Sequence, residues 1–178
     1  MRRLVKSLTR FRRRENGSAT IEFCIWVPFF IMIFGSAFEA SLISMRQVMM
    51  VGAVDRTVRD LQLGNLGNPS ADELKTVICN RAGVIPDCTT SLHIEMERIS
   101  TDDFVFRTGA VQCVDRDEET EPALNFSNGG TNELMLLTVC AAFRPMIPTT
   151  GLGLKLPRIN GGNYYGLTTF SAYVVEPA

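Results

Sequence analysis

The chain has 178 residues, of which 46% are apolar, and its 18 basic and 19 acidic side chains give a formal net charge of −1. The charge is unevenly distributed, because residues 1–17 contain seven basic side chains and a single acidic one, Glu15. The rest of the chain is therefore acidic overall, which argues against a nucleic-acid-binding protein. A basic segment can be a nucleic-acid-binding arm, but here an apolar segment follows it directly.

The apolar segment behind this leader is long enough to cross a membrane. Between residues 23 and 38 only Pro28, Gly35 and Ser36 are not apolar. A bilayer requires about 20 residues, and basic residues beside a membrane span stay in the cytoplasm. We therefore predict a basic cytoplasmic leader over residues 1–17 and a transmembrane helix over residues 18–45, with the remainder of the chain outside.

A cleaved secretory signal is the alternative interpretation of this segment. Gly35, Ser36 and Ala37 are small residues of the kind that signal peptidase accepts, so that cleavage after Ala37 stays open. The leader would be unusually long for such a signal, and Glu22 would have no purpose in it. A carboxylate in a membrane helix costs about 2.5 to 3.5 kcal/mol at the helix centre on insertion scales, so Glu22 is a functional candidate.

The helix is expected to continue beyond the membrane. Apolar residues recur there at intervals of three and four, which is typical of a helix with one buried face. These residues are Val51, Val54, Val58 and Leu61. We predict one helix over residues 19–62, whose extracytoplasmic half, residues 46–63, backs a folded domain. Pro28 lies inside this helix and is either a kink used in assembly or a tolerated proline.

Residues 64–178 are predicted to form a periplasmic α+β domain. A glycine-rich stretch ends the long helix, and Ser70 with Glu73 resembles a capping box for a second helix over residues 71–80. Four later segments have the patterns of mainly antiparallel strands, separated by long polar loops at 115–132 and 145–165. These strands are predicted at 91–99, 104–114, 134–143 and 167–175. The small sheet should pack against the outer half of the long helix.

Four of the five cysteines fall in this outer domain, at Cys79, Cys88, Cys113 and Cys140. An even number outside the cytoplasm predicts two disulfide bonds. Three pairings are possible, and we favour Cys79 with Cys88, which closes a short turn, and Cys113 with Cys140, which ties two strand segments. A zinc site is the alternative, but no Cys-x-x-Cys spacing is present, and neither a metal nor another cofactor is expected.

No catalytic residues are expected. His93 is the only histidine, and its place in a predicted strand favours a structural role. The sequence has no nucleophile elbow and no glycine-rich phosphate loop. A group of acidic residues could hold calcium, but it lacks the spacing and the glycine turn of an EF-hand, so a solvated loop is the preferred interpretation. The group comprises Asp115, Asp117, Glu118, Glu119 and Glu121.

The N-terminal segment as a whole resembles a known processing signal. A basic leader ends at Gly17, Ser18 follows, and Glu22 is fifth after the glycine at the start of an apolar helix. This arrangement resembles the class III signal of type IV pilins and pseudopilins. Within that class the chain is similar to the TadE-like minor pseudopilins (TadE/TadF family) of the tight-adherence (Flp, type IVc) pilus system. The similarity extends to Val27-Pro28, Glu39, residues 54–59, residues 77–79, Cys88 and residues 175–177.

The resemblance implies that a prepilin peptidase cuts between Gly17 and Ser18. Glu22 would become mature residue five, and its carboxylate could meet the new amine of Ser18 in the same subunit or a neighbouring one. The implied partners are the peptidase, other pseudopilins and pilin subunits, the inner-membrane pilus assembly platform and the lipid bilayer. The implied location is the bacterial inner membrane, with the N-terminus cytoplasmic, the C-terminal domain periplasmic, and incorporation into the pilus left open.

The leading functional hypothesis is a minor pseudopilin that helps to initiate or regulate pilus assembly and carries out no chemistry itself. Ser18 replaces the aromatic first residue of many type IV pilins, and the outer domain is far larger than the Flp pilin, so a minor role is favoured over bulk filament. Two alternatives stay open. One is an unprocessed membrane-anchored domain that binds an envelope or surface ligand, and the other is a secreted enzyme.

Overall fold

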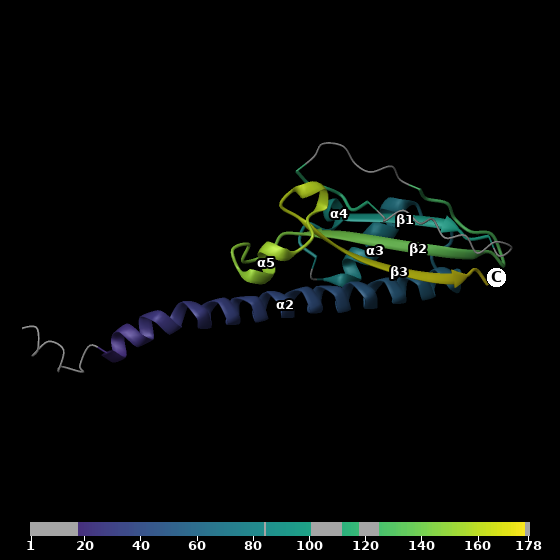
Figure 1. Cartoon of the computed structure of the whole chain (residues 1–178). Helices are drawn as coiled ribbons and strands as arrows, with labels where there is room; N and C mark the ends of the chain where they lie inside the picture. The colour runs from purple at the N-terminus through teal and green to yellow at the C-terminus, as the bar shows by residue number, and fades with distance from the viewer. Residues whose placement is uncertain (1–17, 84, 101–111, 118–124, 177–178) are drawn as a thin grey trace, which may run out of the picture.

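The structure of the protein is a computed structural model that describes residues 18–83, 85–100, 112–117 and 125–176. Its elements are a long helix, α2 (Ser18–Gln62), a short α3 (Ala71–Ala82), and three strands that form one sheet. Figure 1 shows α2 extending far beyond a small domain, which lies along only its C-terminal half. The predicted class is therefore confirmed, since the chain is an α+β protein with a long N-terminal apolar helix, an antiparallel sheet and two disulfide bonds.

Helix α2 has 45 residues and runs without interruption through Pro28, so the predicted helix over residues 19–62 is confirmed. Its beginning is inclined to the rest of the helix (Figure 1), as is common near a proline that removes one backbone hydrogen bond. At the other end Gly64 has a φ of 72°, a left-handed conformation that glycine adopts at little cost and that ends the helix. The buried side chains of Val54, Val58 and Leu61 line the face that the apolar spacing predicted.

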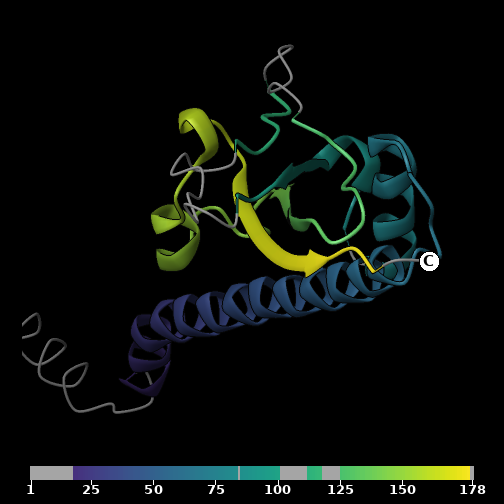
Figure 2. The same ribbon diagram turned by 90° about the vertical axis from the view of Figure 1, so that its right-hand side faces the viewer.

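The sheet has the strand order β1-β2-β3, with both pairs antiparallel. The strands are β1 (Leu92–Arg98), β2 (Leu134–Phe143) and β3 (Tyr165–Val174). The central strand β2 is buried over most of its length. One face of the sheet packs on α2 and α3, and Figure 2 shows β3 curving down so that its C-terminal end lies beside α2. The core of the domain lies between these layers.

Helix α3 begins and ends with the signals that its sequence contains. The Ser70 side chain accepts a hydrogen bond from the Glu73 backbone N–H, and the Glu73 carboxylate accepts one from the Ser70 backbone N–H at 2.8 Å. Gly83, with a φ of 63°, is the C-cap. The predicted helix over residues 71–80 therefore exists and is two residues longer. An ion pair of 2.6 Å between Arg81 and Asp60 attaches α3 to α2.

Two strand predictions need correction. Residues 112–114, the end of the predicted strand 104–114, are not in a strand, and the preceding residues 104–111 lie outside the described part of the chain. The predicted strand 91–99 begins at Leu92, because Ser91 belongs to a short helix, α4 (Cys88–Ser91). Neither segment could be placed by alternation alone, since the Cys79–Cys88 and Cys113–Cys140 disulfides constrain both.

The predicted loop over residues 145–165 also contains structure. It includes α5 (Gly151–Lys155) and a 3₁₀ turn, η2 (Ile159–Gly161), and β3 begins at Tyr165 rather than at residue 167. Thr150 caps α5 by accepting a hydrogen bond from the Gly153 backbone N–H at 3.3 Å. Helices this short give no periodic signal, so only their caps are visible in a sequence.

Candidate functional site

The N-terminal half of α2 is an exposed apolar helical segment, called the apolar rod below. Its large side chains are exposed on every face, each by more than half of its surface. They are Ile21, Phe23, Ile25, Trp26, Phe29, Phe30, Ile31, Met32, Ile33, Phe34 and Phe38. In the part of the chain that the structure describes, α2 is the one helix long and apolar enough to cross a membrane. This exposed helix indicates a single-pass membrane anchor.

Glu22 lies on this apolar rod and is exposed. Its carboxylate makes no hydrogen bond or ion pair with another described residue. Together with Phe23, Trp26 and Phe30 it lines a shallow groove on the helix surface. Ser18 is the first residue of α2, and residues four apart in a helix lie on the same face. Ser18 and Glu22 are therefore one turn apart on one face, while Gly17 lies outside the described residues.

Glu39 has the opposite environment, although it is on the same helix. Its side chain is fully buried. The carboxylate accepts hydrogen bonds from the backbone N–H of Met146, 3.1 Å from each oxygen, and from that of Ile147 at 3.2 Å. Such bonds offset the desolvation of a buried carboxylate. In the sequence Glu39 belongs to the family pattern but has no predicted role of its own, although a lone carboxylate in an apolar run is a signal that can single it out.

Gly35 brings the same loop against α2 one helical turn earlier. A Cβ atom at this position would lie 3.0 Å from Cγ2 of Thr150 and 3.6 Å from Cδ1 of Ile147. A side chain at this position would be in unusually tight contact with Thr150, so glycine favours the close approach of the loop. Glu39 and Gly35 therefore hold residues 146–150 on the last turns of the apolar rod.

Arg46 marks the place where α2 begins to pack against the sheet. Its guanidinium donates a hydrogen bond of 2.9 Å to the Tyr165 hydroxyl and lies 4.8 Å from the centre of the Phe143 ring. Burial raises the pKa of Tyr165, and the hydrogen bond from Arg46 partly opposes this shift. The phenol stays neutral at physiological pH. Arg46 thus joins α2 to the adjoining ends of β2 and β3.

The disulfide pairing is the one favoured from the sequence. Cys79 bonds Cys88, and Cys113 bonds Cys140. The first bond ties the end of α3 to the start of α4, and the second ties residues 112–117 to β2. Cys24 is a free, exposed cysteine on the apolar rod.

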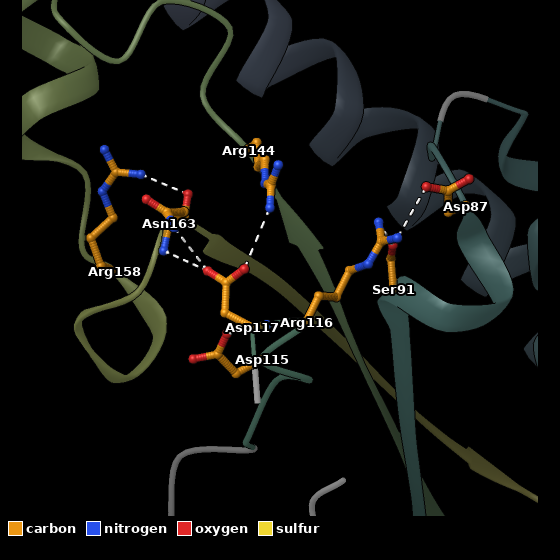
Figure 3. Close-up of polar contacts among 8 residues, drawn as sticks. All are labelled: Asp87, Ser91, Asp115, Arg116, Asp117, Arg144, Arg158 and Asn163. Atoms are coloured by element: carbon orange, nitrogen blue, oxygen red, sulfur yellow. Dashed lines mark hydrogen bonds and ion pairs between the residues drawn. The ribbon is translucent and has the colours of Figure 1, made fainter. Parts of the chain in front are cut away.

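A polar cluster at the end of the sheet nearer the apolar rod connects several loops (Figure 3). The Asp117 carboxylate accepts hydrogen bonds from the Asn163 side chain at 3.0 Å and backbone N–H at 3.3 Å, and from Arg144 at 3.4 Å. The bonds from Asn163 are the main reason that the pKa of Asp117 is lowered. Arg116 donates to Asp87 at 3.1 Å and to Ser91 at 3.3 Å. The cluster is an internal cross-link between loops.

Within the described residues, no group of three or more histidine, cysteine or acidic side chains is placed to hold a metal ion. Asp115 and Asp117 of the acidic loop accept hydrogen bonds from the protein itself, and the other three acidic residues of that loop lie outside the described part. His93 is buried in β1 with Nε2 3.4 Å from a carboxylate oxygen of Glu95. Its position in the strand is the one predicted.

Comparison with known proteins identifies the helical segment. Residues 17–59 match the family model described as TadE-like protein. Searches of curated proteins and of solved structures returned no match. The matched segment begins at Gly17, contains Glu22, Gly35 and Glu39, and ends three residues before the end of α2. The predicted resemblance is thus confirmed over residues 17–59, and the match does not extend to residues 77–79, Cys88 or residues 175–177.

Proposed function

We propose that this chain is a minor pseudopilin that helps to initiate or regulate assembly of a tight-adherence pilus after a prepilin peptidase has cut it between Gly17 and Ser18. The TadE-like match, which begins at Gly17, supports a role in this pilus system. The observation that carries the proposal is Glu22, an exposed carboxylate without a described partner on an apolar helix.

The proposed role of Glu22 follows from its energetics. A carboxylate in lipid is costly unless it is paired. Cleavage after Gly17 creates an amine on Ser18, one turn from Glu22 and on the same helical face. The amine of the same subunit or of a neighbouring subunit would then neutralise Glu22. Glu22 would thus fix the position of one α2 helix along the next as subunits assemble.

The proposed topology places the leader in the cytoplasm and the sheet domain in the periplasm, because seven basic residues precede the apolar rod. The chain would start in the inner membrane, where it meets the peptidase, the assembly platform and the other pseudopilins, and it can enter the pilus from there. We propose no catalytic activity for it. Its exposed apolar helix suits packing into a bundle of similar helices.

The cleavage step is tested by the mass of the mature N-terminus. We expect the purified membrane form to begin at Ser18, and Gly17→Leu to give a full-length, membrane-bound protein, because a bulky side chain blocks the scissile bond. Asn16→Leu is the control, since it changes a leader residue that is not at the bond. A native protein with an intact leader would favour an unprocessed anchored domain, and a chain that begins after Ala37 would indicate a secreted product.

The assembly step is tested by Glu22→Ala and Glu22→Gln. Both variants should be cleaved normally but should lose pili and co-purification with other pseudopilins, because neither side chain can pair with the amine. Glu22→Asp keeps the charge and should retain part of the function. Normal pili in both neutral variants would refute the role of Glu22, whatever the mass of the N-terminus.

A further inference from the structure

An apolar loop of the sheet domain, residues 145–156, lies beside the apolar rod. It contains Met146, Ile147, Leu152, Leu154 and Leu156, and Lys155 is its single charged residue. Met146 is 62% exposed and Leu154 is 69% exposed. Figure 1 shows α5, within this loop, as the described element of the domain that extends farthest toward the N-terminal half of α2. We propose that this loop inserts into the outer leaflet of the lipid bilayer and forms a second membrane contact.

The contacts with α2 give the depth of the loop. The main run of exposed large apolar side chains extends from Ile21 to Phe38, with Met45, Val48 and Met49 as further exposed ones on α2. We take the middle of the main run, near residue 30, as the middle of the span. Half of a hydrocarbon core of about 30 Å corresponds to roughly ten residues of helix, which places the outer boundary at about residue 40. Thr150 and Ile147 approach Gly35, about five residues, or roughly 7 Å, inside this boundary. Interfacial segments bury their apolar faces to about 5 to 10 Å.

Many backbone N–H groups of the loop have a partner within the protein, as such a position favours. In hydrocarbon every backbone polar group needs a partner from the protein. Glu39 accepts the N–H groups of Met146 and Ile147, and Thr150 donates to the Ile147 carbonyl at 3.2 Å. The Gly153 N–H donates to the Thr150 hydroxyl, and the Leu154 N–H donates to the Thr150 carbonyl. The Leu156 N–H donates to the Leu152 carbonyl. Prolines, which have no N–H, occupy positions 145, 148 and 157.

This position also gives a reason for the buried carboxylate of Glu39. An exposed loop in water needs no such acceptor, because water satisfies its N–H groups. A loop in lipid has no water to use, and Glu39 satisfies two of these groups from the helix side. On the other side of the loop, Arg158 donates a hydrogen bond of 2.8 Å to the Gly153 carbonyl. Lys155 and Arg144, both exposed, can extend their charged ends to the headgroups.

The proposal requires that α2 spans the membrane, but it does not depend on leader cleavage or on a pilus. The test uses the full chain reconstituted in phosphatidylcholine and phosphatidylglycerol vesicles. Trp26, the only tryptophan, is first replaced by phenylalanine (Trp26→Phe). A single new tryptophan, Leu154→Trp, then reports the depth of the loop in the bilayer. Lipids brominated at different acyl positions quench tryptophan fluorescence according to depth.

Phe170→Trp in the same background is the matched control. Phe170 is 74% exposed and lies on β3. This strand and the residues that follow it run along α2, since Gln47 donates to the Thr168 carbonyl and the Gln62 carbonyl accepts from the Glu176 N–H. This part of α2 is well outside the boundary near residue 40. The control therefore samples a side chain of similar exposure in water.

We expect at least twofold stronger quenching of Leu154→Trp than of Phe170→Trp, with shallow bromines at acyl carbons 6 and 7 more effective than deep ones. Met146→Trp is the second reporter and should agree, so that the test survives if one variant folds poorly. Equal quenching of loop and control would overturn the proposal. A blue-shifted loop tryptophan that bromines do not quench would also overturn it, because another protein surface would then cover the loop.

Discussion

Two glutamates on α2 show how strongly position decides the role of a residue. Glu22 is exposed on the apolar rod, whereas Glu39 is fully buried and satisfied by backbone N–H groups. In the sequence each is a charge in an apolar helix. The difference arises because the loop that meets Glu39 is 107 residues away along the chain.

Replacement of Glu39 by glutamine should destabilise the domain. The amide presents one acceptor oxygen and an N–H₂ group that cannot accept from Met146 or Ile147, which leaves a buried donor without a partner. We expect a loss of about 1 to 3 kcal/mol in the free energy of unfolding, measured by denaturant titration in detergent micelles. Glu22→Gln is the control and should leave this free energy unchanged. Equal stability of the two variants would contradict the assigned role of Glu39.

Gly166 is required by the disulfide that it faces. A Cβ atom there would lie 2.5 Å from Sγ of Cys113 and 3.3 Å from Sγ of Cys140. Gly166→Ala should therefore cost about 1 to 3 kcal/mol, as overpacking does. Gly151→Ala is the control, because a Cβ atom at Gly151 meets nothing within 4 Å. Thermal unfolding of both variants compares them, and an unaffected Gly166→Ala would show that the disulfide can move aside.

At the scale of elements, the sequence predicted those that have strong local signals. The apolar spacing of α2, the capping box of α3 and the run of β-formers in β2 all correspond to observed elements. The prediction of a strand over residues 112–114 was wrong, and α4 and α5 were missed. These segments are held by disulfides, by Glu39 and by the polar cluster around Asp117, and none of these contacts is local.

The two disulfides should contribute unequally to stability. They join residues separated by 9 and by 27 positions, and loop-closure entropy grows with that separation. The chain-entropy relation gives about 2.6 kcal/mol for Cys79–Cys88 and about 3.6 kcal/mol for Cys113–Cys140. Double serine variants of each pair, compared by urea unfolding, should show the larger loss for Cys113 and Cys140. Cys24→Ser is the control for a free thiol and should change nothing, whereas a reversed order would mean that factors other than loop length dominate.

At the scale of the whole molecule, one helix connects two environments. The N-terminal half of α2 exposes its apolar side chains on all faces, and the C-terminal half contributes Val54, Val58 and Leu61 to the domain core. Between them Gly35, Glu39 and Arg46 attach the domain to the helix. The domain is therefore held at a defined distance from the start of α2, which is what a subunit of an ordered assembly requires.

Acid should destabilise the domain through carboxylates that accept hydrogen bonds in the fold. Hydrogen bonds, chiefly from Asn163, lower the pKa of Asp117 below 3.8. Hydrogen bonds likewise lower the pKa of three other carboxyl groups: the bond from Arg81 to Asp60, the bond from the Ser70 backbone to Glu73, and the bond from the Gly130 backbone to Glu133. A group with a lowered folded pKa adds stability above its unfolded value and loses it as the pH falls through the folded value. Stability should therefore be full above pH 4.5, the ordinary glutamate value, and should decline below it.

Asp117→Asn tests this dependence directly. The variant should be less stable than the native protein at pH 6, and the difference should shrink as the pH falls below 3.8 and through the lowered pKa of the native carboxylate. Asp55→Asn is the control, since the Asp55 side chain is exposed and forms no hydrogen bond or ion pair with another described residue. Urea unfolding at several pH values supplies the measurement. A difference that is constant with pH would assign the loss to packing rather than to charge.

The sequence by itself determined the long helix, its apolar first half, the capped second helix and the place of Glu22, because helical periodicity, caps and isolated charges are local properties. It also favoured the correct cysteine pairing. Only the tertiary structure decided that Glu39 is satisfied, that Gly35 admits an apolar loop beside the membrane span, and that Asp117 cross-links loops. Each of these depends on contacts between segments far apart in the chain, and local patterns do not encode which distant backbone or side chain will approach.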